Sequence, residues 1–176
     1  MKLFIEPEVK IRWPGKANRK MKTILSVRPY LQEYFDLPWN QVEITIEAGR
    51  KPTAKGIITN GYSTYYDDIY HIRLICNGYF RTEDETIETL GHELTHLVQF
   101  YKGSLRYSKY EGFVFWNQMH MPLQQASQGH DFDIYRNSPW EKEAHENGAK
   151  FLAHVRSKQK TKPNLIERIL RYFKSF

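Results

Sequence analysis

Hydrophobic residues recur at helical spacing in the middle of the chain, in one stripe between Thr82 and Gly103. The positions of this stripe are Ile87, Leu90, Leu94, Leu97, Val98 and Tyr101. Thr82 followed by Glu85 has the pattern of a capping box, and an acidic first turn suits the helix dipole. Gly103 is typical of the position just beyond a helix end. The pattern predicts an amphipathic helix between these two residues.

Alternating and β-branched segments before this helix predict strands. They are residues 42–46, 55–59, 62–66 and 71–76, with a tight turn at residues 60–61. Residues 17–36 and 139–157 have helical spacing. Pro29 predicts a kink in the first of these helices, or a short second helix after Ser26. Ser138 is a good N-cap for the last helix.

Residues 103–138 contain one short β segment, Phe113–Trp116, and are otherwise expected to be irregular. A stretch of that length is usually functional, so we expect it to wrap the site. The order of elements predicts an α+β fold, in which a small mixed or antiparallel sheet packs on the central helix and the helix at 139–157.

Length and charge indicate the domain organisation. A chain of 176 residues with 40% hydrophobic residues can form one packed domain. Residues 156–176 hold seven basic residues and one acidic residue, so they carry the whole formal net charge of +6. We expect a single domain over residues 1–157, a basic linker over 158–163 and an amphipathic basic helix over 164–176. That helix suits packing on the domain, a protein partner or an acidic surface.

Cys76 is the single cysteine, which excludes an internal disulfide and a cysteine-based zinc cluster. A lone cysteine suits a reducing compartment. The first 20 residues lack the apolar run of a secretory signal, and no stretch approaches the 18 apolar residues of a membrane span. A cytoplasmic location is the expectation.

His92, Glu93 and His96 form the pattern His-Glu-x-x-His on the predicted central helix. Positions i and i+4 share one face of a helix, so two imidazoles there can bind one metal ion. Glu93 projects toward the same side, where it can hold a metal-bound water. On a capped amphipathic helix, this combination favours a metal site over a solvated polar face.

A catalytic zinc site needs a third protein ligand and one open position. Glu141 is favoured because it borders the apolar stripe of the helix at 139–157, although it could instead close a capping box with Ser138. Glu143 lies farther round that helix. His130 is the alternative that would give a three-histidine site. The weaker candidates are His71, His120 and His154.

The run from His92 to Gln99 resembles the active-site helix of gluzincin-type metallopeptidases. Residues 135–144 resemble the glutamate helix of a group of small, often phage-encoded zinc metallopeptidases, and Phe115-Trp116-Asn117 fits the same group. The resemblance covers about residues 80–150 and implies a minimal zincin-like catalytic domain. It also implies a location in the cytoplasm, which for a phage protein is the host cytoplasm, or in the virion.

The resemblance implies one zinc ion bound by His92, His96 and Glu141. It makes Glu93 the general base of peptide-bond hydrolysis. Several gluzincin groups have Asp or Asn four residues after the ligand glutamate, where this chain has His145. The residue that orients a metal-bound histidine therefore stays open. The candidates are His145, Asn147 and Glu143.

The expected substrate is a peptide or protein, which a strand of the sheet could bind in extended form. A tyrosine could stabilise the oxyanion, and the candidates are Tyr107, Tyr110 and Tyr135.

One alternative function is that of a binding or virion structural protein with a non-catalytic zinc, although the intact Glu93 argues against it. Another follows from a weaker similarity to SprT-like proteases of DNA–protein crosslinks, with His130 as third ligand and the basic tail near nucleic acid. The neutral charge of residues 1–155 weakens nucleic-acid binding by the whole protein.

Overall fold

The computed structural model describes seven stretches of the chain, namely residues 8–12, 14–48, 61–66, 69–76, 82–107, 113–122 and 135–161. These stretches form a mixed α+β fold of three α-helices and two small sheets, in agreement with the predicted class. The helices are α1 (Pro14–Tyr34), α2 (Glu83–Tyr101) and α5 (Pro139–Thr161), with a short 3-10 helix, η1, at Trp39–Gln41. None of the helices in the described stretches is long and apolar enough to cross a membrane.

The larger sheet contains β1 (Glu8–Arg12), β2 (Val42–Ala48), β3 (Gly61–Tyr66) and β4 (Ile69–Cys76). Its spatial order is β1-β2-β4-β3, with β1, β2 and β4 parallel and the edge strand β3 antiparallel to β4. The predicted strands at 42–46, 62–66 and 71–76 are confirmed, whereas the predicted strand at 55–59 lies outside the described residues. The sequence pattern did not predict β1.

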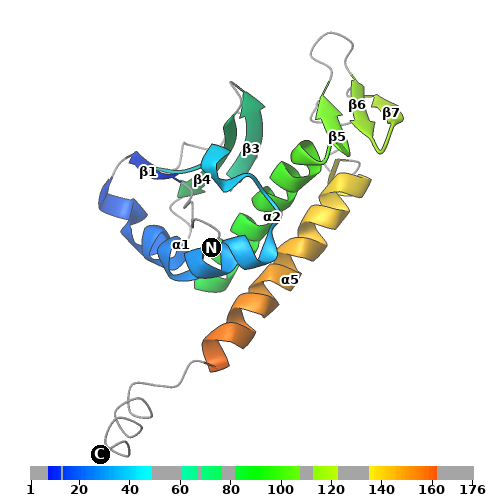
Figure 1. The fold of residues 1–176 in the computed structure, drawn as a ribbon. Helices are drawn as coiled ribbons and strands as arrows, with labels where there is room; N and C mark the ends of the chain where they lie inside the picture. The colour runs from blue at the N-terminus through cyan, green and yellow to red at the C-terminus, as the bar shows by residue number, and fades with distance from the viewer. Residues whose placement is uncertain are drawn as a thin grey trace, which may run out of the picture.

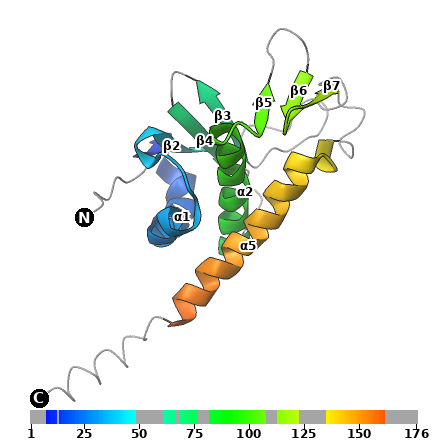
Figure 2. The same ribbon diagram turned by 45° about the vertical axis from the view of Figure 1, so that its right-hand side comes forward.

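One face of this sheet packs on the helices. Val42 and Ile44 of β2 pair in register with Tyr70 and Ile72 of β4, and all four are buried. The helices add Ile24, Val27 and Leu31 from α1, Ile87, Leu90, Leu94 and Leu97 from α2, and Phe151 and Val155 from α5. Helix α2 contacts the sheet and both other helices, and Figure 2 shows it between α1 and α5.

Both ends of α2 are fixed by local hydrogen bonds. The Thr82 hydroxyl accepts a hydrogen bond from the Glu85 N–H at 3.1 Å, and the Glu85 carboxylate accepts one from the Thr82 N–H at 2.7 Å. Beyond the last turn, Gly103 has φ +71° and its N–H donates to the Phe100 carbonyl. The predicted capping box and glycine stop are confirmed, so the position of the His-Glu-x-x-His pattern in mid-helix follows from sequence.

The predicted β segment at Phe113–Trp116 is confirmed, whereas the expectation that the rest of residues 103–138 is irregular is wrong for Leu105–Tyr107 and Met119–Pro122, which are strands. The three segments form an antiparallel sheet of β5 (Leu105–Tyr107), β6 (Phe113–Trp116) and β7 (Met119–Pro122). Leu105, Val114 and Trp116 are buried against Trp140 of α5, which explains why this small sheet is stable. Figure 1 shows the sheet beside the start of α5.

Helix α5 continues to Thr161, so it is four residues longer than predicted, and residues 158–161 of the predicted 158–163 linker are helical. Contacts with the other helices hold its last turns: Arg156 bonds Asp84 of α2, and Lys158 pairs with Glu33 of α1. Residues 162–176, with the expected basic helix at 164–176, lie outside the described residues. Helix α1 is continuous through Pro29, so no second helix begins after Ser26.

Candidate metal centre

His92 and His96 project from one face of α2, because 3.6 residues make one turn. Their Nε2 atoms lie 3.1 Å apart and their ring planes are nearly perpendicular. The side chain of His96 is 8% exposed and that of His92 is 16% exposed. Two imidazole nitrogens from successive turns therefore meet at one largely buried point.

Glu141 of α5 brings a carboxylate to the same point. Its Oε2 lies 3.3 Å from His92 Nε2 and its Oε1 lies 3.1 Å from His96 Nε2. With the Nε2–Nε2 distance of 3.1 Å, these atoms form what we call the donor triangle of His92, His96 and Glu141. A tetrahedral zinc ion with bonds of about 2.0–2.1 Å keeps its ligand atoms about 3.3 Å apart. The spacing and chemistry of the donor triangle fit such an ion.

Two glycines allow α5 to approach α2 this closely. A Cβ on Gly91 would lie 3.1 Å from the Gly148 Cα, and a Cβ on Gly148 would lie 2.7 Å from the Glu88 carbonyl oxygen. Only hydrogen atoms fit between the two backbones at this crossing. Gly91 is the neighbour of His92, so the close crossing helps Glu141 to reach both histidines.

Gly148→Ala should separate the helices, because the added methyl group meets backbone rather than a flexible side chain. Overpacking costs about 1–3 kcal/mol, and the better helix propensity of alanine returns about 1 kcal/mol at most. We expect lower stability in chemical denaturation and weaker zinc binding. Ala149→Ser, at the exposed next position, is the control. Wild-type stability and zinc affinity in Gly148→Ala would show that the close crossing is not required.

The ionisable side chains of the donor triangle shift one another's pKa. Burial alone would raise the pKa of Glu141, but its close contacts with His92 and His96 outweigh burial and hold that pKa far below its usual range. Burial would likewise lower the pKa of His96, whereas its close contact and charge interaction with Glu141 raise it. The negative carboxylate therefore favours positive charge at the centre of the triangle, as a metal site requires.

Glu93 is buried in the same turn of α2 as His92. Its negative charge also raises the pKa of His96, so its carboxylate acts electrostatically on the donor triangle. Its role as a general base stays a prediction, because that role concerns a substrate and a water.

Glu143 lies away from the donor triangle, on the exposed side of α5. Its Oε2 accepts a hydrogen bond from Gln99 Nε2 at 2.9 Å, so Glu141 is the carboxylate at the histidines. His130 lies outside the described residues. The weaker candidates lie elsewhere: His71 beside Glu43, His120 beside Phe115 and His154 beside Glu33.

His145, one turn after Glu141, packs against His92 with ring centroids 4.5 Å apart. One ligand atom each of His92, Glu141 and His145 lie within 4.8 Å of one another. Partial burial and the neighbouring His92 lower the pKa of His145, which favours its neutral form. Within the described part of the chain, His92 Nδ1 is buried with no hydrogen-bond partner. Asn147 is half-buried on α5.

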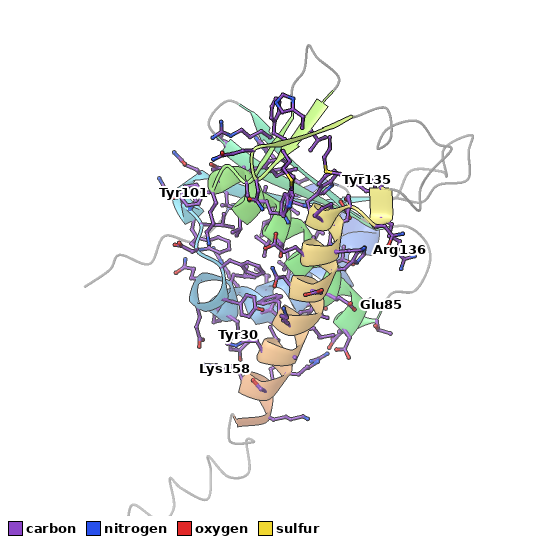
Figure 3. The ribbon with its side chains drawn as sticks, turned by 90° about the vertical axis from the view of Figure 1, so that its right-hand side faces the viewer. Tyr30, Glu85, Tyr101, Tyr135, Arg136 and Lys158 are labelled. Atoms are coloured by element: carbon purple, nitrogen blue, oxygen red, sulfur yellow. The ribbon has the colours of Figure 1, made fainter. Side chains whose placement is uncertain are left out.

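Of the candidate tyrosines, Tyr135 reaches the centre: a hydrogen bond from Tyr135 contributes to the low pKa of Glu141. Figure 3 shows Tyr135 and Arg136 near the start of α5, and Lys158 near its other end. Tyr110 and the side chain of Tyr107 lie outside the described part of the chain.

Sequence reasoning missed the role of Gln99, whose Oε1 lies 2.8 Å from His96 Nδ1. The available signal was its position three residues after His96, which places both on one face of α2. The residues of α5 that contact Gln99 could not be predicted from the sequence pattern of α2 alone.

Comparison with protein-family models, with curated proteins and with solved structures finds no match to this chain. Inferences about its function therefore rest on the donor triangle and its surroundings.

Proposed function

We propose that the protein is a zinc-dependent peptidase in which His92, His96 and Glu141 bind one metal ion. The observation that carries the proposal is the donor triangle, whose edges of 3.1–3.3 Å suit tetrahedral zinc. Two imidazoles and a carboxylate leave a fourth position for water. The same donors can hold other divalent ions, so zinc is the first metal to test.

When bound, zinc would lower the pKa of its water toward about 7 and polarise a substrate carbonyl. Glu93 would accept the proton of the attacking water and pass it to the leaving amine. The Tyr135 hydroxyl, held near Glu141, is the described tyrosine best placed to donate a hydrogen bond to a developing oxyanion.

An extended peptide is the proposed substrate because an edge strand lies beside the helix that carries His92 and His96. Among the described strands, β3 lies at one edge of the larger sheet, and it contacts α2. An extended chain could add to that edge by main-chain hydrogen bonds, with its scissile bond over the donor triangle. On this basis we propose a zincin-like fold, in which an edge strand lies beside the helix that carries the metal-binding histidines.

Metal removal tests the proposal. We expect the purified protein to cleave fluorescently labelled casein, to lose this activity when a chelator removes zinc, and to regain it with one equivalent of zinc per chain. Metal content is measured on the same samples. Hydrolysis that persists after zinc has been removed would contradict the proposal.

His145 supports a second candidate function, a binding protein with a closed metal site. Its ring against His92 offers a fourth donor, and four protein ligands are typical of structural zinc. The buried Glu93 favours the catalytic alternative, because a structural site needs no base.

A further inference from the structure

Gln99 is buried and polar, and it joins the donor triangle to helix α5. It is 2% exposed, and its two side-chain ends have different neighbours. Its Oε1 lies 2.8 Å from His96 Nδ1. Its Nε2 donates to the Trp140 carbonyl at 3.0 Å and to Glu143 Oε2 at 2.9 Å.

These neighbours determine the orientation of the Gln99 amide. A main-chain carbonyl and a carboxylate only accept hydrogen bonds, so the NH₂ group of Gln99 must face them. The amide oxygen is thereby turned toward His96. Because that oxygen can only accept, His96 must carry its proton on Nδ1.

A neutral His96 with its proton on Nδ1 has its lone pair on Nε2. That nitrogen is the one in the donor triangle, 3.1 Å from Glu141 Oε1. Two acceptors on α5 therefore select, through one amide, the tautomer in which His96 can bind a metal.

We infer that Gln99 and Glu143 form a relay that fixes the tautomer of His96 and raises its strength as a metal ligand. The negative charge of Glu143 polarises the Gln99 amide, and the polarised oxygen strengthens the hydrogen bond from His96 Nδ1. Histidine ligands commonly donate to a carboxylate directly, whereas here an amide stands between the two. Gln99 is thus a positioning residue, and this inference rests on the proposed function.

A purely structural role would also explain the contact of Gln99 with Trp140, since that bond ties α2 to α5. Glu143→Gln separates the two explanations. The substituted amide can still accept from Gln99 and keep the tie, but it lacks the charge. Glu146→Gln is the matched control, because Glu146 is exposed on the same helix and the change in net charge is identical.

Zinc affinity is measured by competition with a chromophoric chelator. Gln99→Met, of similar size and without hydrogen bonds, should weaken zinc binding by about 10–100-fold, as loss of a ligand's supporting partner does. Glu143→Gln should weaken it by about 10-fold, and Glu146→Gln should leave it unchanged. In zinc-loaded protein, the Nδ1 proton resonance of His96 should move upfield in Glu143→Gln and stay in place in Glu146→Gln.

Wild-type zinc affinity and an unmoved His96 resonance in Glu143→Gln would overturn the relay. Wild-type affinity in Gln99→Met would overturn the positioning role itself. Thermal melting of each variant is the control for folding. The failure of the proposed metal site, on which the proposed function depends, has a different signature. In that case His96→Ala would bind zinc as tightly as wild type, whereas a failed relay leaves His96→Ala defective.

Discussion

Replacing Glu93 with Gln is expected to lower peptide hydrolysis by about 10²–10⁴-fold, the range for loss of a general acid–base group. The amide has nearly the size of the carboxylate, so the packing around this buried position should survive. It cannot accept a proton from water at neutral pH, which removes the proposed step. The donor triangle does not include Glu93, so zinc should remain bound at one ion per chain.

The kinetic measurement is kcat/KM for labelled casein, with zinc content determined on the same sample. Glu88→Gln, an exposed position on the same helix, is the control and should keep full activity. Hydrolysis by Glu93→Gln at the wild-type rate would remove the general-base assignment. Loss of zinc from this variant would instead indicate that Glu93 supports the metal.

Glu141→Gln should weaken zinc binding by more than about 100-fold, because loss of a ligand exceeds the 10–100-fold cost of losing its support. The substitution replaces the charged member of the donor triangle with a neutral amide at 3.1–3.3 Å from both histidines. Activity should fall with metal occupancy.

The zinc affinities of three neighbouring glutamate variants can be compared with one another. Zinc affinity should fall most in Glu141→Gln, by about 10-fold in Glu143→Gln, and not at all in Glu146→Gln. A larger loss in Glu143→Gln than in Glu141→Gln would contradict the ligand assignment and the proposed relay together. Retention of wild-type affinity in Glu141→Gln would point to another donor, such as His145.

Local signals allowed the central helix to be predicted from sequence. The capping box at Thr82, the glycine at 103 and the apolar spacing all act within a few residues. They therefore determine where α2 begins and ends and on which face of it His92 and His96 lie. The choice of Glu141 over Glu143 also came from a helical face, since only the first borders the apolar stripe.

Contacts between residues far apart in the chain could not be predicted from the sequence. Strand β1 forms by pairing with β2 across the length of α1, and nothing within Glu8–Arg12 specifies that partner. The β6–β7 turn at Asn117 and Gln118 has two positive φ values without the glycine that usually indicates such a hairpin. The contact of Gln99 with Glu143 joins two helices, and the glycine crossing that permits it appears only when both are packed.

The most direct test of the central claim is zinc-edge X-ray absorption of the protein loaded with one equivalent of zinc. The donor triangle predicts four nitrogen or oxygen neighbours at about 2.0–2.1 Å, with the multiple scattering of two imidazoles and one solvent oxygen. Three imidazoles without solvent would contradict the catalytic account and indicate a closed site that includes His145. A sulfur neighbour at about 2.3 Å would place the metal at Cys76 and contradict the donor triangle altogether.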